Sequence, residues 1–90
     1  MILSNNQLND FENLAFDIGG EVYENYSGRD MYGKTCMGIT VDNLYKALFN
    51  LGRESENYDF AKELERLEVD NLGRSYIIYF PRIQKEVDGE

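Results

Sequence analysis

The spacing most suggestive of chemistry lies between residues 28 and 35. This stretch, Gly28-Arg29-Asp30-Met31-Tyr32-Gly33-Lys34-Thr35, matches the nucleotide-binding pattern G-x-x-x-x-G-K-S/T. In that pattern, backbone N–H groups cradle phosphates, while the lysine and the hydroxyl serve phosphate and magnesium. The chemistry requires a helix directly after the lysine, with its amino end facing the phosphate. Here a β-like run follows instead, Cys36-Met37-Gly38-Ile39-Thr40, so we do not expect a P-loop enzyme.

A weaker prediction is that the loop binds an anion without having enzymatic activity. Glycine lets the backbone approach an anion closely, and several cations lie at turns of an otherwise acidic chain. A phosphate-bearing nucleotide would then bind at a candidate anion site that consists of Gly28, Arg29, Gly33, Lys34, Thr35 and Arg74. The alternative is that the two loop glycines shape a hairpin and that the cations pair with Asp30 or other nearby acids.

Tyrosines and acids form a second candidate site, for a protein partner. Of the seven tyrosines, Tyr23, Tyr26 and Tyr32 surround the loop, and rings of this kind anchor partners well. The remaining four are expected at the core or its edge, namely Tyr45, Tyr58, Tyr76 and Tyr79. The candidate partner-binding residues are Glu21, Glu24, Tyr26, Met31 and Tyr32.

The net charge of -8 restricts the partners that fit. Seventeen Asp and Glu face nine Lys and Arg, and residues 4–26 contain no Lys or Arg. Such a surface repels nucleic acid, whereas it suits a basic groove in which carboxylates stand in for phosphates. We therefore expect a host protein or nucleoprotein with a basic surface as the partner, and no direct nucleic-acid binding. The alternative is that the acids keep a small protein soluble.

The residue inventory argues against enzyme chemistry. Histidine is absent, which removes the commonest general base and metal ligand. The single cysteine, Cys36, has no partner for an internal disulfide and fits a buried structural thiol better than a nucleophile. One cysteine without histidine cannot build a zinc site, and the acids lack the spacing of a calcium loop. We expect no catalytic residue, no metal and no cofactor.

Periodic patterns predict the elements that must position these residues. Apolar spacing of three and four residues predicts helices over 4–18 and 41–51, capped by Ser4 or Asn5 and by Thr40. A third helix is expected to begin at Ser55 or Asn57 and to carry Leu67 inward. Alternating or β-branched runs predict strands over 21–26, 34–41 and 76–80, with a turn over 70–73 and fraying of the last residues.

These elements predict an α+β fold in a single domain, residues 1–90. An N-terminal helix is followed by an antiparallel sheet of about three to four strands, with two further helices packed on one face. The longest apolar run, over 76–80, is far short of the roughly 20 residues that span a bilayer, so we expect no membrane contact and a cytoplasmic location. Because a core of this size gives little surplus stability, we expect that homo-oligomerisation would add to it.

Two segments of the sequence resemble a group of known proteins. Residues 26–38 follow the pattern Y-S-G-R-x-M-Y-G-x-x-C-x-G, and residues 70–81 follow a later D-N-x-G-R strand that ends in aromatic-Pro. This combination resembles small uncharacterised proteins of phages and mobile elements. Small acidic phage proteins of this size often inhibit bacterial defence, either as anti-CRISPR proteins that occupy nucleic-acid sites or as small proteins that sequester nucleotide signals. By this analogy of size and origin, the resemblance implies an anti-defence role in the host bacterial cytoplasm.

Two functions follow as hypotheses. The first is a non-enzymatic phage-type inhibitor that binds a host defence component through an acidic surface and the loop 26–32. The alternative is a small-ligand binder that sequesters a phosphate-bearing nucleotide signal at the loop 28–35. Salt dependence separates them, because a phosphate mimic in a basic groove weakens steeply with ionic strength and a dry nucleotide pocket weakens less.

Overall fold

The order of helices and strands confirms the predicted α+β fold. The computed structural model describes residues 1–86, and residues 87–90 lie outside the described part. The elements, in chain order, are β1 (Ile2–Leu3), α1 (Asn5–Asp17), β2 (Gly20–Tyr26), β3 (Cys36–Val41), α2 (Leu44–Glu54), the 3-10 helix η1 (Ser55–Asn57), α3 (Ala61–Leu64), β4 (Glu68–Asn71), β5 (Tyr76–Phe80) and β6 (Gln84–Lys85). The expected fraying of the last residues falls on 87–90, outside the described residues, whereas β6 just before them is paired.

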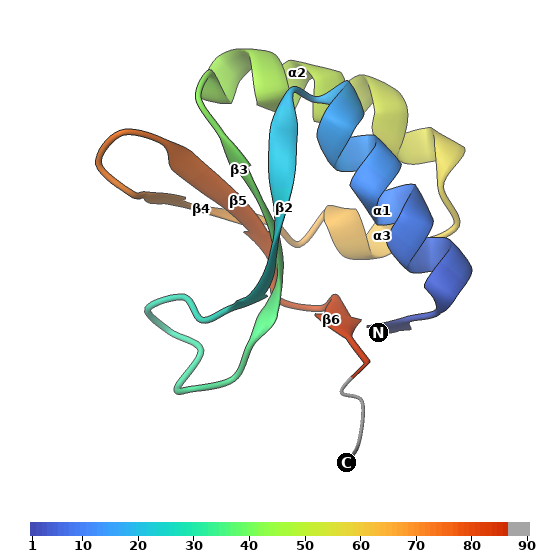
Figure 1. Cartoon of the computed structure of the whole chain (residues 1–90), viewed down its shortest axis with the longest axis horizontal. Helices are drawn as coiled ribbons and strands as arrows, with labels where there is room; N and C mark the ends of the chain where they lie inside the picture. Colours follow the sequence, from blue (N-terminus) through green and yellow to red (C-terminus); the bar gives the residue numbers. More distant parts are fainter. Residues whose placement is uncertain (87–90) are drawn as a thin grey trace.

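Four strands form one antiparallel sheet in the order β2-β3-β5-β4. The central pair runs from Met37 opposite Phe80 to Val41 opposite Tyr76, and β2 and β4 are the edges. A separate parallel pair joins β1 to β6 and brings the start of the chain beside residues 84–85. Figure 1 shows the α-helices on one side of the sheet and the loop between β2 and β3 extending from one end of these strands.

Local capping explains where the first two helices begin. Ser4 accepts a hydrogen bond from the Gln7 backbone N–H at 3.2 Å, and the Gln7 side chain accepts one from the Ser4 N–H at 2.9 Å, which is a capping box. Helix α2 begins three residues later than predicted, with Asn43 and not Thr40 as its cap, because Val41 is still paired with Tyr76 in the sheet. Within residues 1–86, no helix has the length and apolar character to cross a membrane.

The third predicted helix is wrong in extent. The chain instead forms η1, a turn over 58–60 and the single-turn helix α3, after which residues 68–71 form the edge strand β4. Asp70 and Asn71, predicted in a turn, therefore belong to a strand because they pair with β5. A polar side chain competes for a backbone group in this segment, because the Ser55 hydroxyl donates to the Gly52 carbonyl at 3.4 Å, and Tyr58 is then extended. The break lets the Tyr58 ring stack on the Phe60 ring, with centroids 5.4 Å apart.

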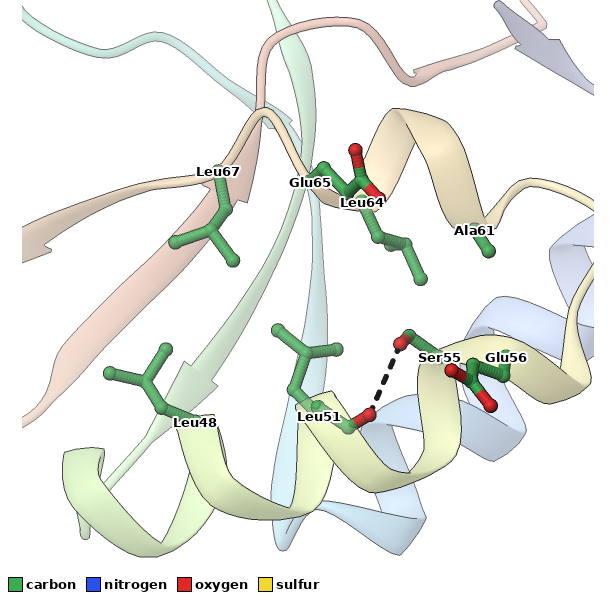
Figure 2. Close-up of a pocket in the computed structure, with 9 residues that line it drawn as sticks. Leu48, Leu51, Ser55, Glu56, Ala61, Leu64, Glu65 and Leu67 are labelled. Carbon is green, nitrogen blue, oxygen red and sulfur yellow. Dashed lines mark hydrogen bonds between the residues drawn. The ribbon is translucent and has the colours of Figure 1, made fainter.

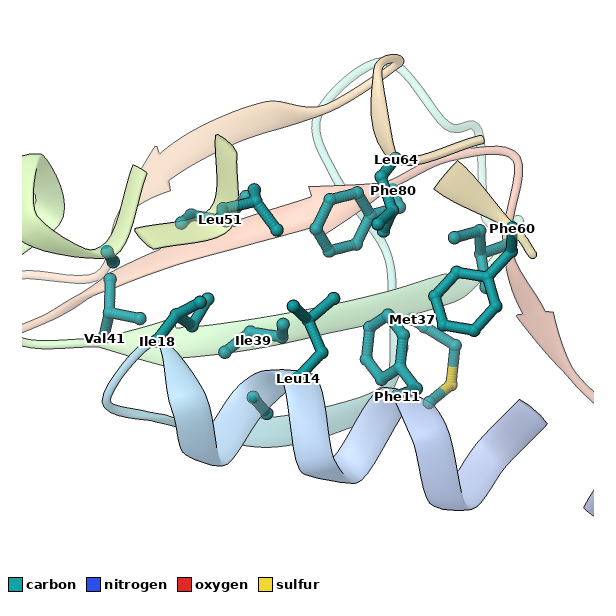
Figure 3. Close-up of a cluster of buried hydrophobic side chains, with 14 of the residues drawn as sticks. Phe11, Leu14, Ile18, Met37, Ile39, Val41, Leu51, Phe60, Leu64 and Phe80 are labelled. Atoms are coloured by element: carbon teal, nitrogen blue, oxygen red, sulfur yellow. The ribbon is translucent and has the colours of Figure 1, made fainter. Parts of the chain in front are cut away.

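The main core lies between the helices and one face of the sheet. Figure 3 shows Phe11, Leu14 and Ile18 of the first helical segment facing side chains of β3 and β5. The Phe11 ring meets the Phe80 ring edge-on, at 5.7 Å and 90°, and lies 6.2 Å from the Phe60 ring. Burying each side chain of this size contributes roughly 1.5–3 kcal/mol, so this cluster fixes how the helices sit on the sheet.

Candidate functional site

The sheet has a second face that no helix of the described chain covers. Because side chains alternate along a strand, Met37 and Ile39 of β3 point toward the helices, whereas Cys36 joins a smaller cluster on the opposite face. The strand register extends this face to both edges, since Glu21 lies opposite Thr40 and Asp70 lies opposite Ile77. We call this surface the open face, and its residues are Glu21, Tyr23, Tyr26, Cys36, Gly38, Thr40, Glu68, Asp70, Ile77 and Tyr79.

A β-bulge decides which residues of β2 reach the open face. Tyr23 pairs with Gly38 and Tyr26 pairs with Cys36, so β2 carries one extra residue, and Asn25 there has a φ of 59°. The extra residue returns Tyr26 to the same face as Tyr23. Glu24 lies between them and has another partner, because the Lys85 ammonium donates to its carboxylate at 2.7 Å.

Three tyrosines lie together on the open face. The Tyr26 hydroxyl donates to the Asp70 carboxylate, and so it connects the edge strand β2 with the opposite edge strand β4. The Tyr26 ring lies 4.9 Å from the Tyr79 ring and meets the Tyr23 ring nearly at right angles, 5.6 Å between centroids. Ring contacts at these distances stabilise beyond area burial, so the layer presents a preformed surface.

Burial and neighbouring carboxylates keep these groups protonated. Burial is the main cause that raises the pKa of Tyr26, and the hydrogen bond to Asp70 and its charge add to it. Burial, followed by the charges of Asp70 and Glu68, raises the pKa of Tyr79 to about 12. Burial likewise raises the pKa of the Cys36 thiol to about 11, as expected of a buried structural thiol. At neutral pH the site therefore offers neutral donors and not nucleophiles.

The loop over 27–35 packs back onto this layer. Gly28 is buried against Tyr79, and a Cβ atom at position 28 would lie 2.7 Å from the tyrosine ring, so only glycine allows this approach. Met31 is half-buried on the cluster, with its sulfur 3.7 Å from the Cys36 sulfur. Tyr32 stands at the tip of the loop, 92% exposed and with a φ of 54°.

The Gly28 to Thr35 pattern does not form a P-loop. Strand β3 begins at Cys36, directly after Thr35, and it is antiparallel to both neighbours. Two backbone N–H groups of the loop already donate within it, from Met31 to the Gly28 carbonyl at 3.1 Å and from Lys34 to the Met31 carbonyl at 3.0 Å. The strand that the sequence indicates is therefore present where nucleotide binding would need a helix.

The candidate anion site does not assemble within one chain. Arg29 and Lys34 are exposed near the start of β3, whereas Arg74 lies in the turn before Tyr76, which pairs with Val41 at the far end of β3. At roughly 3.3 Å per residue, the strand separates the two ends by on the order of 15 Å. Lys34 instead lines a shallow pocket of about 260 Å³ together with Thr35 and the acidic Asp30.

All charged residues of the four-stranded sheet are acidic. Its four strands contain four carboxylates and no Lys or Arg. Three of these carboxylates belong to the open face, at its two edges: Glu21 on β2, and Glu68 and Asp70 on β4. With the Lys85 ammonium neutralising Glu24 elsewhere, the open face has a negative potential around its tyrosines.

The structure thus brings part of the predicted partner site together. Glu21 and Tyr26 share the open face, Met31 packs on it from the loop, Tyr32 stands on the loop beside it, and Glu24 is separated from them. The predicted site omitted Tyr23, Glu68, Asp70 and Tyr79. The alternation Glu68-Val69-Asp70-Asn71 was a strand signal, but the apolar spacing of the preceding residues favoured a continuing helix.

Neither possible metal ligands nor comparison with known proteins indicates a function. Among residues 1–86 there is no group of three or more Cys, Asp or Glu side chains placed to hold a metal ion. Comparison with protein-family models, with curated proteins and with solved structures finds no match. The open face itself therefore provides the main indication of function.

Proposed function

We propose that this protein is a non-enzymatic, phage-type inhibitor, similar in role to anti-CRISPR proteins. It binds a basic surface of a host defence protein or nucleoprotein through the open face and the adjoining loop. The observation that carries the proposal is a helix-free sheet face on which three carboxylates surround a preformed tyrosine layer, on strands without Lys or Arg. The resemblance to small phage and mobile-element proteins supports the biological setting.

The arrangement suits binding because its parts are already ordered. Tyr26 and Tyr79 are held by packing and by the contact with Asp70, so little side-chain entropy is lost when a partner docks. Tyr23, 46% exposed, and Tyr32, 92% exposed, supply the outward aromatic surface that anchors interfaces. The carboxylates at the two edges attract Lys and Arg of the partner and raise the association rate.

Charge reversal on the open face tests the proposal. The test variant is Glu21→Lys with Glu68→Lys, and the matched control is Glu12→Lys with Asp17→Lys on α1, which changes the net charge equally at exposed acids. Binding to purified CRISPR effector nucleoproteins is measured by biolayer interferometry over a range of ionic strength. We expect the open-face variant to lose at least roughly tenfold more affinity than the control.

Two results would count against this function. Equal losses in both variants would mean that overall charge, and not the open face, determines binding. A wild-type protein that binds none of the basic effectors would contradict the anti-defence role.

The nucleotide-sequestering alternative has less support from the geometry. Its cations are split between two ends of the sheet, and Asp30 shares the pocket with Lys34. Native mass spectrometry with a pool of nucleotides and cyclic nucleotide signals distinguishes it, since a retained nucleotide mass that disappears in Lys34→Ala would favour the loop 28–35 as the site.

A further inference from the structure

Helices α2 and α3 enclose an apolar groove on the side of the molecule away from the open face. We call it the α2 groove, and its volume is about 280 Å³. Figure 2 shows Leu48 and Leu51 of α2 pointing toward Leu64 and Leu67 across the gap. The volume lies below that of pockets for drug-sized ligands, so it suits one or two protein side chains. Its remaining lining residues are Gly52, Ser55, Glu56, Ala61 and Glu65.

Two aromatic side chains project into solvent beside this groove. Tyr45, predicted at the core or its edge, is instead 87% exposed, and Phe49, one helical turn further along α2, is 66% exposed. We call this pair the aromatic ridge. At 100° per residue they share a stripe with Leu48 and Gly52, which line the groove. Helix α2 therefore has a second apolar stripe, in addition to the one formed by its buried residues.

The groove and the ridge carry charges of opposite sign on their outer flanks. The Arg53 guanidinium lies 5.9 Å from the centre of the Phe49 ring, and its 4.0 Å contact with Glu54 is at the outer limit for an ion pair. Lys46 is exposed on the same flank. The far rim of the groove carries the exposed acids Glu56 and Glu65. The basic flank of the ridge and the acidic rim of the groove are therefore complementary in charge.

We infer that a second copy of this chain occupies the α2 groove. A two-fold axis that is parallel to α2 and lies between the two copies of this helix places the aromatic ridge of each copy over the groove of the other. Such an interface is isologous. The same rotation brings the basic flank, with Arg53, over the acidic rim, with Glu65. Gly52 leaves room for the approach, because a Cβ atom there would meet nothing within 4 Å. This inference is independent of the proposed function, since both open faces remain accessible in the pair.

Sedimentation equilibrium over micromolar to millimolar concentrations tests the pairing. We expect the wild-type mass to rise from that of the 10.5 kDa chain to twice that value. Phe49→Ser should raise the dimer dissociation constant roughly a hundredfold or more, because the two-fold pair loses one aromatic anchor from each copy. The matched control is Phe16→Ser, because Phe16 is 82% exposed on α1 and lies outside the groove. A wild-type chain that stays monomeric, or equal effects of both variants, overturns the inference.

Two further variants test the details of the interface. Gly52→Leu adds a side chain at the mouth of the groove, and its Cβ atom would meet nothing within 4 Å. Because leucine also favours the helix more than glycine does, we expect weaker dimerisation with an unfolding midpoint that does not fall. Arg53→Glu and Glu65→Arg should each weaken the dimer, and the double variant should restore it. Additive losses in the double variant would rule out this two-fold arrangement.

Discussion

The hydrogen bond between Tyr26 and Asp70 is the contact that holds the open face across its full width. Tyr26→Phe removes the donor and keeps the ring in contact with Tyr79. Hydrogen bonds to a charged group contribute roughly 1.5–3 kcal/mol, and both residues here are half-buried, so we expect the lower end, about 1.5 kcal/mol. Asp70→Ala removes the acceptor. In the double variant the two losses should not add, with a coupling free energy of about 1–1.5 kcal/mol.

Urea denaturation of the four proteins in this double-mutant cycle measures the coupling. A chain of this size has an m value of about 1 kcal/mol/M, so a loss of about 1.5 kcal/mol in Tyr26→Phe should lower the midpoint by about 1.5 M. The control is Tyr45→Phe, since the Tyr45 side chain is exposed and its change should alter the free energy of unfolding by less than about 0.5 kcal/mol. A coupling below about 0.3 kcal/mol would contradict this role for the hydrogen bond, because it would show that the hydroxyl and the carboxylate act independently.

Two other properties of the open face can be measured. Gly28→Ala should destabilise the fold by about 1–3 kcal/mol, because its Cβ atom would lie 2.7 Å from the Tyr79 ring. The control Gly52→Ala, whose Cβ atom meets open space on α2, should stabilise the fold by about 0.5–1 kcal/mol. Thermal unfolding that ranks the two variants the other way contradicts the close packing of Gly28 on Tyr79. Because the pKa of Tyr79 is raised from 10.0 to about 12, its neutral form is favoured in the folded protein, so this contribution to stability is fully present below pH 10 and is lost as pH rises toward 12. The free energy of unfolding of the wild type and of Tyr79→Phe, measured at several pH values, checks the direction of this change. If Tyr79→Phe loses as much stability between pH 10 and 12 as the wild type, the loss belongs to other groups.

Much of the architecture is local and was predictable. Helices α1 and α2 follow from apolar spacing and polar caps, and β5 follows from five consecutive apolar residues ending at Pro81. The failure of a helix to follow Lys34 was also predictable, because a β-like run occupies that position. These features depend on neighbours within a few residues of one another, which is why the sequence contains the signal.

The candidate site depends more on contacts between distant segments. Residues 68–71 become a strand because β5 supplies their hydrogen-bond partners, and the alternation of four residues is a weaker signal than the helical spacing that precedes it. Strand alternation alone separates Glu21 from Glu24, but it places Tyr26 on the wrong face. The extra residue at Asn25 returns Tyr26 to the face of Tyr23, and this β-bulge is visible only in the pairing of β2 with β3.

Composition and short-range pattern were enough to establish an acidic α+β domain without histidine, with one buried thiol and with a loop that cannot be a P-loop. The tertiary structure decided that the Tyr26 hydroxyl reaches Asp70, 44 residues further along the chain, and that Arg74 lies at the other end of the sheet from Lys34. Strand order and register set these distances, and both follow from packing the sheet against the helices, which involves most of the chain at once.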